Sequence, residues 1–473
     1  MSGPKRATSV ERLALPTILI FATLLRLPGL DGQLWLDEIY AWLDHFRVPL
    51  AELVTHYRGD VQHTSYAVLA NLLVSLLGEA RWVVRLPAVL AGVAGIAATH
   101  FLVARFVDFR SGLLAAFLLA VSFHHVWFSQ NARGYTLLAF LVMTSAHALL
   151  RILEDTKASR AHQALYAASV GLAVYTHLTM VFVAAGHLAV VLISTKHRRR
   201  LQPFLVALFA AALVSILLYG PMAGELVLNF VRKSSKLRAV STPAWAGREA
   251  ARVLSFGLSG VGLAIAALCG IAGLVVSIRA RPALTAVLTL PVLTTVGGAL
   301  LVRGTLYPRF FFFAAGAGAC FVAAGAAELS RFLARGGRPI PGRALVGVLF
   351  AAGSASALFE NATLPKQDFE GALRFVEGAR AGSEPIVTAG TTVRPYRDYF
   401  GRSFVAVDDP RAFDQVRTSS SAWLLYSMPR FLVGSAPHVF RAASEECAES
   451  RSFRGTLHDG DVYACHLRQW PSH

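Results

Sequence analysis

Two adjacent carboxylates, Asp37 and Glu38, are the residues of this sequence best placed for proton-transfer chemistry. They lie in the stretch Leu-Trp-Leu-Asp-Glu at residues 34–38, directly after the first long apolar run. Acids beside lipid are costly unless they are solvated or used, which makes them candidates for function. The alternative is a solvated helix N-terminus, where the helix dipole favours Asp and Glu.

Several other apolar runs carry a cation, an imidazole or a phenol at one end. Arg and Tyr anchor at lipid headgroups in many polytopic proteins, and this is the simpler reading of any single one of them. As a set they are harder to explain, because they lie at the ends of the apolar runs that we expect outside the cytoplasm, whereas basic residues of membrane proteins are usually in excess on the cytoplasmic side. The set comprises His63, Tyr66, Arg81, Arg85, Arg133, Tyr135, His177, Tyr307 and Arg309.

The composition identifies the kind of molecule that must position these residues. Of 473 residues, 55% are hydrophobic and only 15% are charged, whereas about a quarter of a soluble protein is charged. The sequence therefore predicts a membrane protein. Its net charge of +17 lies in short gaps between apolar runs, where basic residues set topology, so we expect no nucleic-acid partner.

Apolar runs of the length that crosses a bilayer recur along the first three quarters of the chain. A spanning helix needs about 20 such residues, fewer where neighbouring helices bury its ends. When the gaps are assigned alternately to the two sides, the short gaps on one side hold basic clusters such as Lys196 to Arg200 and Arg331 to Arg343, which predicts a cytoplasmic N-terminus and an external C-terminus. The eleven expected spans are 13–30, 82–104, 111–129, 135–151, 163–177, 178–194, 201–220, 257–278, 283–302, 309–330 and 344–360.

Three segments are expected on the outer side. Residues 31–80 show helical apolar spacing, typical of amphipathic helices that lie in the membrane interface. Residues 221–256 form a basic loop. Residues 361–473 alternate helix-like stretches with short apolar runs, which favours a small α/β domain. We therefore predict a transmembrane domain over residues 1–360 and an extracytoplasmic domain over residues 361–473.

An ordered series of short motifs carries a family resemblance over roughly residues 11–330. The series resembles the GT-C membrane glycosyltransferases, most closely glycosyltransferase family 39, which includes protein O-mannosyltransferases and the lipid A aminoarabinose transferase. Its specificity lies in the order of the motifs rather than in any one of them. The motifs are Trp-Leu-Asp-Glu (35–38), His-x-x-Tyr (63–66), Arg-Leu-Pro-Ala (85–88), Ser-Gln-Asn-Ala-Arg-Gly-Tyr (129–135), Tyr-Thr-His (175–177) and Tyr-Pro-Arg-Phe (307–310).

The resemblance implies a reaction and a role for the two acids. Family members take a sugar from a polyprenyl-phosphate donor on the outer face of the membrane, and Asp37 matches their catalytic base. Glu38 matches the neighbour of that base, and we predict that it is a supporting catalytic acid that positions Asp37 or the donor. Many relatives have two prolines where this chain has Thr64 and Ser65, and Glu where it has Asn131. The second departure makes a metal-assisted carboxylate cluster less expected, so we predict no metal and no cofactor besides the lipid-linked donor.

Elementary chemistry agrees with this reading. A glycosyl transfer to a hydroxyl needs a carboxylate to take the proton and cations to stabilise the departing phosphate. We expect Arg133, Arg309 and His63 to bind that phosphate. We expect Tyr66, His177 and Tyr307 to line the same cavity. The basic loop that would close over it contains Arg232, Lys233, Lys236 and Arg238.

The sequence also gives expectations for the partners of the protein, its compartment and the alternative function classes. The partners are membrane lipid, a polyprenyl-phosphate sugar and a glycan, lipid or protein acceptor, in the inner membrane of a bacterium. Cys447 and Cys465 are predicted to form a disulfide in an oxidising compartment, with two separately buried thiols as the alternative. The other function classes are a transporter, a polyprenyl-linked transferase of another branch, and a non-catalytic scaffold. Span interiors nearly free of carboxylates argue against a transporter.

Overall fold

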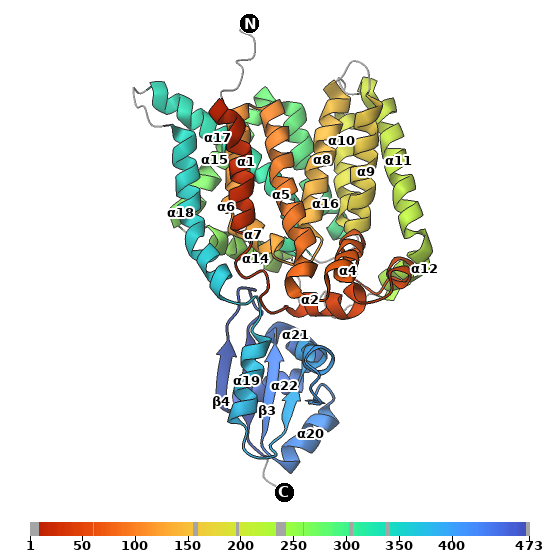
Figure 1. Ribbon diagram of the computed structural model, residues 1–473, viewed down its shortest axis with the longest axis vertical. Helices are drawn as coiled ribbons and strands as arrows, with labels where there is room; N and C mark the ends of the chain where they lie inside the picture. The colour runs from red at the N-terminus through yellow and green to blue at the C-terminus, as the bar shows by residue number, and fades with distance from the viewer. Residues whose placement is uncertain are drawn as a thin grey trace.

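A bundle of long helices and a small five-stranded sheet lie at opposite ends of the protein (Figure 1). This computed structural model describes residues 9–59, 61–154, 159–194, 198–232, 243–258, 260–301, 306–335 and 341–469. The first helix begins at the end of the bundle that is remote from the sheet (Figure 1). The sides of the membrane on which the two ends of the chain lie stay a prediction.

Helix is present in each of the eleven predicted spans. Their apolar side chains leave the backbone no partner but itself in lipid, which is why helix is the outcome. The helices are α1 (Ser9–Leu24), α5 (Arg81–Phe106), α6 (Phe109–Val121), α7 (Phe123–Ser129), α8 (Tyr135–Glu154), α9 (Arg160–Thr176), α10 (Thr179–Ile193), α11 (Leu201–Tyr219), α15 (Gly260–Ala280), α16 (Pro282–Leu301), α17 (Ala315–Arg335, preceded by the 3₁₀ turn η4, Pro308–Ala314) and α18 (Gly342–Thr363).

The predicted polytopic helical fold is confirmed, whereas the count of eleven spans stays a prediction. Within the described ranges, seven helices are long and apolar enough to cross a membrane, and the bent pair α6 and α7 makes up to eight. Helix α10 is apolar but shorter, and α9 has 17 residues. His177 separates α9 from α10. Its extended backbone (φ −158°, ψ 126°) ends α9 at the boundary between the predicted spans 163–177 and 178–194.

Helices α6 and α7 meet at an angle of 64°. Ser122 lies at the bend in an extended conformation, and its hydroxyl accepts from the backbone N–H of His125, which caps the first turn of α7. After this bend, α7 lies toward the end of the bundle that faces the sheet domain (Figure 1).

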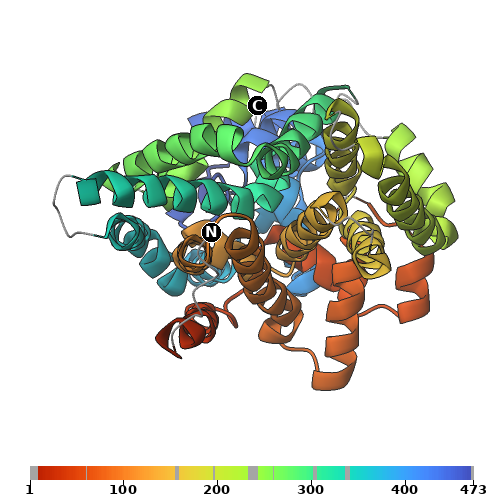
Figure 2. The same ribbon diagram turned by 90° about the horizontal axis from the view of Figure 1, so that it is seen from above.

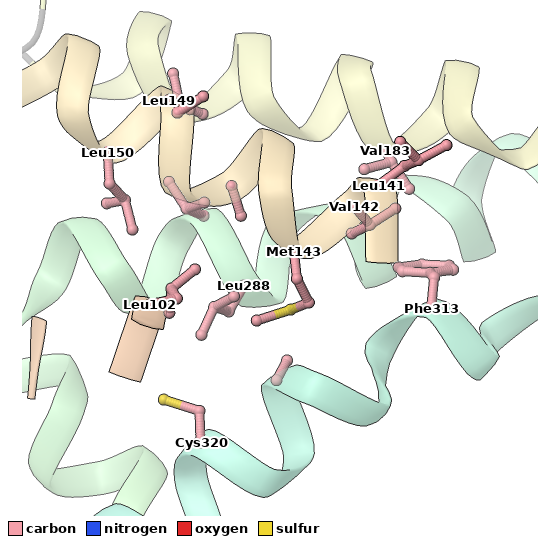
Figure 3. Close-up of a cluster of buried hydrophobic side chains, with 14 of the residues drawn as sticks. Leu102, Leu141, Val142, Met143, Leu149, Leu150, Val183, Leu288, Phe313 and Cys320 are labelled. Atoms are coloured by element: carbon pink, nitrogen blue, oxygen red, sulfur yellow. The ribbon is translucent and has the colours of Figure 1, made fainter. Parts of the chain in front are cut away.

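The centre of the bundle is apolar and closely packed. Leu102 of α5, Met143 of α8, Leu288 of α16 and Cys320 of α17 meet in one buried cluster (Figure 3). Helix α11 lies at the rim (Figure 2), with 17% of its apolar window buried against 72% for α8. The apolar surface left open on α11 is that expected of a lipid-facing helix.

Helices α15 and α17 touch backbone to backbone. A Cβ atom on Gly325 of α17 would lie 2.0 Å from the carbonyl oxygen of Cys269 of α15. Helices in lipid commonly approach through small residues, because dispersion contacts replace the missing hydrophobic drive. The absence of a side chain at Gly325 therefore allows α15 to pack directly against α17.

The first outer segment is helical, as its apolar spacing predicts. It comprises α2 (Leu36–Ala41), a π-helical turn η1 (Trp42–Phe46), α3 (Leu50–Thr55) and α4 (Thr64–Leu77). Helix α4 buries Ala70 and Val74 and exposes Leu69 and Leu76. An apolar outer face of this kind suits the membrane interface.

The second outer segment was expected to be a loop, and this expectation is wrong for its described part. After a 3₁₀ turn η3 (Gly220–Met222) come α12 (Ala223–Arg232) and α14 (Pro243–Gly257). The expectation of a loop rests on the charges of this segment alone. Its alanines and the proline at the start of α14 favour helix. The basic residues Lys233, Lys236 and Arg238 lie outside the described residues, as does the side chain of Arg232.

The sheet of the C-terminal domain has the strand order β2-β1-β3-β5-β4. Strand β1 runs parallel to β2 and β3, while β5 is antiparallel to β3 and β4. This confirms the predicted small α/β domain. The strands are β1 (Ile386–Thr388), β2 (Val405–Ala406), β3 (Ala422–Ser427), β4 (Cys447–Phe453) and β5 (Val462–Leu467).

Helices cover both faces of this sheet. Trp423 and Leu425 of β3 pack with Phe369 and Leu373 of the helix that opens the domain. Leu424 faces the other side, because side chains alternate along a strand, and packs in the cluster of the remaining helices. The helices are α19 (Phe369–Ala379), α20 (Pro410–Ser419), α21 (Pro429–Ser435) and α22 (Pro437–Glu445), with the turns η5 (Gly390–Thr392) and η6 (Pro395–Tyr399).

Candidate active site

The Asp37 carboxylate meets two arginines from distant parts of the chain. Asp37 is the second residue of α2, and its side chain is 15% exposed. Its Oδ2 lies 3.5 Å from Nη1 of Arg309 and 3.9 Å from Nη2 of Arg133. The structure therefore brings together three of the residues singled out from the sequence.

Glu38 points away into the protein and is fully buried. Both of its oxygens accept from Arg85, at 2.9 Å from Nε and 2.6 Å from Nη2. The backbone N–H of Ala132 also donates to it at 2.6 Å. Burial alone would raise the pKa of Glu38, but Arg85 outweighs it and the pKa is lowered. Glu38 is thus an ionised structural carboxylate that ties α2 to the loop after α7.

Arg85 extends this tie to the end of the first span. Its Nη1 donates to the carbonyl oxygens of Leu30 (2.7 Å) and Gly32 (2.8 Å), and its Nη2 donates to that of Gln33 (3.0 Å). The five donors of the guanidinium thus hold the turn between α1 and α2. Asp37 is fixed in place because the chain on both sides of it is fixed.

His63 and Arg133 present two N–H donors to the same region. The backbone N–H of Gly134 donates to Nδ1 of His63 at 2.9 Å, so in the neutral ring the proton is on Nε2. Burial, with Arg133 adding to it, lowers the pKa of His63 well below 6.5 and keeps the ring neutral. Nη2 of Arg133 lies 3.1 Å from that Nε2. Two donors cannot satisfy each other, but one anionic oxygen can accept from both.

Aromatic rings surround these donors. The ring of His177 lies 5.0 Å from that of His63 and 5.2 Å from that of Phe310. The guanidinium of Arg309 stacks over Tyr307 at 4.7 Å. His177 and Tyr307 therefore lie at the predicted site, with rings that lower the local dielectric and strengthen charge interactions.

Tyr66 is the one predicted cavity residue that the structure uses otherwise. Its side chain is 1% exposed, and its hydroxyl donates to the carbonyl oxygen of Val84 at 2.6 Å. The ring packs against Phe46. We correct its role to packing between α4 and α5, since a hydroxyl with a buried backbone partner is committed to the fold.

Two residues of the region were missed from the sequence. His45 of η1 is 2% exposed, and burial together with Arg133 and Arg58 lowers its pKa to about 4 despite the adjacent Asp44. Lys366 is buried beside Glu38, where burial lowers its pKa to about 7. The short distance in sequence from Asp37-Glu38 to Asp44-His45 could have indicated His45 as a residue of this region. Nothing in the sequence indicates that Lys366 lies beside Glu38.

Asn131 lies at the position where the family resemblance implies Glu. It is buried, and its Oδ1 accepts from Nε1 of Trp35 at 3.0 Å. An amide is a weak ligand for a divalent cation compared with a carboxylate. Among the residues that the structure describes, no three His, Cys, Asp or Glu side chains are grouped as metal ligands.

Cys447 and Cys465 are joined in a disulfide, with their Cα atoms 5.5 Å apart. The bond links the edge strand β4 to β5, and Cys465 faces the cluster under α20 and α22. This is the predicted pairing. Cys269 and Cys320 are buried free thiols within the bundle.

The fold defines a class: it is that of the GT-C membrane glycosyltransferases. ArnT from Cupriavidus metallidurans in the apo state matches with a TM-score of 0.57 at 12% identity, over 97% of this chain and 98% of that chain. The same protein bound to undecaprenyl phosphate matches with a TM-score of 0.54 at 13% identity, over 97% and 98%. An oligosaccharyltransferase from Archaeoglobus fulgidus, tethered with an acceptor peptide, matches with a TM-score of 0.57 at 10% identity, over 97% and 74%.

Part of the chain also has sequence similarity to a known family. Residues 65–221 match the family model described as dolichyl-phosphate-mannose-protein mannosyltransferase. No curated protein has significant sequence similarity to the chain. The family model and the structures together confirm the resemblance to GT-C glycosyltransferases that the motifs indicated.

Proposed function

We propose that this chain is a membrane glycosyltransferase that moves a sugar from a polyprenyl-phosphate donor to a hydroxyl acceptor on the outer face of the membrane. The observation that carries the proposal is the convergence of Asp37, Arg133 and Arg309 where the helix bundle meets the C-terminal domain. The structural relative bound to undecaprenyl phosphate supports the donor class.

Asp37 is the proposed general base. Its carboxylate takes the proton of the acceptor hydroxyl, whose oxygen attacks the anomeric carbon while the bond from that carbon to the phosphate oxygen breaks. A single displacement of this kind inverts the anomeric centre. Glu38 holds its neighbour in place and takes no proton, because Arg85 and Ala132 occupy both of its oxygens.

Arg133, Arg309 and His63 are the proposed phosphate ligands. The electron pair of the broken bond stays on the phosphate, where charged and neutral N–H donors stabilise it. Arginine suits this role because its planar fork can donate two parallel hydrogen bonds. The basic segment from Arg232 to Arg238, which was predicted to close over the site, stays a prediction.

The topology supports an extracytoplasmic site. The basic gaps predict a cytoplasmic N-terminus, and the site lies at the opposite end of the bundle from the start of α1 (Figure 1). A disulfide in the C-terminal domain fits an oxidising compartment outside a bacterial inner membrane. We therefore place the chain in that membrane, with the C-terminal domain outside.

Reconstitution into vesicles with a panel of polyprenyl-phosphate sugars tests the proposal. Release of polyprenyl phosphate and labelling of a mixed pool of glycan, lipid and peptide acceptors are the readouts. Transfer by the unmodified chain and its loss in Asp37→Asn support the proposal, with Asp414→Asn on the exposed side of α20 as a matched acid control. Transport of a solute without any transfer would favour the transporter alternative.

A further inference from the structure

The segment that enters the C-terminal domain lies against the start of α2. Gln367 is fully buried, and its Oε1 accepts from the backbone N–H of Leu36 at 2.8 Å. Leu36 is the first residue of α2, and the base proposed above, Asp37, is the second. The contact therefore reaches from one domain to the residue beside the proposed base.

Helix α2 depends on this contact for one of its backbone donors. The first N–H groups of a helix have no partner within the helix and are commonly satisfied by a side chain at the N-cap. Here the N-cap is Trp35, whose side chain makes no capping hydrogen bond. Leu36 is itself buried, so Gln367 supplies the acceptor that a local Ser or Asp would supply elsewhere.

The other end of the Gln367 amide is fixed by the sheet. Its Nε2 donates to the carbonyl oxygen of Gly460 at 2.9 Å and to the hydroxyl of Ser427 at 3.1 Å. Ser427 is the last residue of β3. A side chain held at both ends has one available rotamer, and the amide therefore transmits the position of the strand to α2.

Neighbouring contacts make the same connection. Gln33 donates from Nε2 to Oδ1 of Asp368 at 2.7 Å and accepts from the backbone N–H of Glu370 at 3.0 Å. Lys366 donates to the carbonyl oxygen of Gln130 at 2.6 Å. These bonds flank Gln367 but end on Gln33 and Gln130, whereas the Gln367 bond ends on Leu36, the residue next to Asp37 in the chain.

We infer that Gln367 is a positioning residue through which the C-terminal domain fixes the Asp37 carboxylate. The inference rests on the function proposed above and gives the C-terminal domain a role in it. Displacement of a reacting group by about 1 Å costs up to roughly 100-fold in rate. Loss of this contact is therefore expected to lower kcat far more than it changes the KM for the donor.

The test compares three variants in the vesicle assay. Gln367→Met keeps the volume and removes both polar ends, and we expect kcat to fall roughly 10- to 100-fold with donor KM within about threefold. Gln367→Glu keeps an oxygen for the Leu36 N–H, and burial favours its protonated form, which also keeps a donor. We expect this conservative variant to recover kcat to within about fivefold.

Thr456→Val is the matched control. Thr456 is also a buried contact of the C-terminal domain with the bundle, accepting from Nε1 of Trp127 at 3.1 Å. This bond ends on α7, and Trp127 reaches α2 only through a ring contact with Trp35. Unchanged kcat in Gln367→Met, or an equal fall in Thr456→Val, would overturn the inference.

Amide hydrogen exchange separates failure of the inference from failure of the proposed function. Peptides covering residues 33–41 should exchange faster in Gln367→Met and at the unmodified rate in Thr456→Val, whether or not a sugar donor is known. Unchanged exchange in Gln367→Met overturns the inference. An unmodified chain that transfers no sugar from any donor refutes the proposed function instead.

Discussion

Asp37 and Glu38 are consecutive residues of α2, yet their carboxylates lie in opposite environments. Glu38 is fully buried in a two-pronged ion pair with Arg85, whereas Asp37 is partly exposed, with Arg309 and Arg133 at 3.5 and 3.9 Å. The longer separations leave Asp37 oxygens accessible to a proton donor. One acid of the pair is structural, and the other is the candidate base.

Asp37→Asn should abolish most transfer and leave the fold intact. The amide keeps the shape but cannot take a proton, so kcat is expected to fall by roughly 10² to 10⁴. Donor binding should be largely kept. Steady-state kinetics and a melting curve measured on the same preparation check this, and near-normal turnover would remove Asp37 as the base.

Glu38→Gln should lower the stability of the fold, in contrast to Asp37→Asn. Removing one partner of a buried ion pair leaves the other uncompensated, at a cost of about 3 to 5 kcal/mol. Arg85 would be that uncompensated charge, so lower expression and a lower melting temperature are expected. If Glu38→Gln were as stable as the unmodified protein and inactive, the catalytic role would move to Glu38.

Arg133→Ala and Arg309→Ala should weaken donor binding and slow transfer together. Both guanidinium groups are proposed to contact the phosphate before and after the bond breaks, so KM and kcat change in the same variant. Arg309→Lys should recover part of the loss, because it keeps the charge and loses the fork. Unchanged donor affinity and turnover in both alanine variants would place the phosphate site elsewhere.

His45 predicts a pH dependence of stability. Its pKa is lowered from 6.5 to about 4 by burial and by Arg133 and Arg58, so the unfolded chain binds the extra proton between those values. Stability is therefore present above about pH 6.5 and is lost as the pH falls toward 4, by about 3 kcal/mol at most. Melting curves of His45→Gln in that window should show a smaller loss than those of the unmodified protein. Identical curves would contradict the prediction.

The disulfide should stabilise the C-terminal domain. Cys447 and Cys465 are 18 residues apart, and closing a loop of this length is worth about 3 kcal/mol. Cys447→Ser with Cys465→Ser is expected to lower the melting temperature of the domain, with Cys269→Ala as a control for loss of a thiol. Mass spectrometry without reductant should find the bonded peptide, and two free thiols in membrane-extracted protein would refute the pairing.

Local patterns account for most of what the sequence predicted correctly. Apolar length predicted the helices of the bundle, and the alternation of helix-like stretches with short apolar runs over residues 361–473 predicted the α/β domain. Strand β4 does not stand out in the sequence as an apolar run. It reads Cys-Ala-Glu-Ser-Arg-Ser-Phe and is largely exposed, as an edge strand with few apolar residues is.

Contacts between remote segments account for what was missed. The motif residues Asp37, Arg133 and Arg309 were named from the sequence, but Arg85 as the partner of Glu38 was not, because several arginines had equal claim. Gln367 carries neither charge nor motif, and its significance lies only in its position 331 residues from Leu36. The short helices α12 and α14 were not predicted, because the basic charges of residues 221–256 favour a loop and only the apolar spacing of the segment indicates helix.

The bond from Leu36 to Gln367 also bears on how the protein is made. At about 5 to 20 residues per second, roughly 15 to 65 s separate the synthesis of its two ends. The amino end of α2 leaves the ribosome early, while its acceptor emerges late in translation. Nascent chains that have already inserted their first spans would thus leave the start of α2 without this acceptor until residue 367 is made. Products of premature termination before residue 367 should therefore be membrane-inserted, with faster amide exchange over residues 33–41.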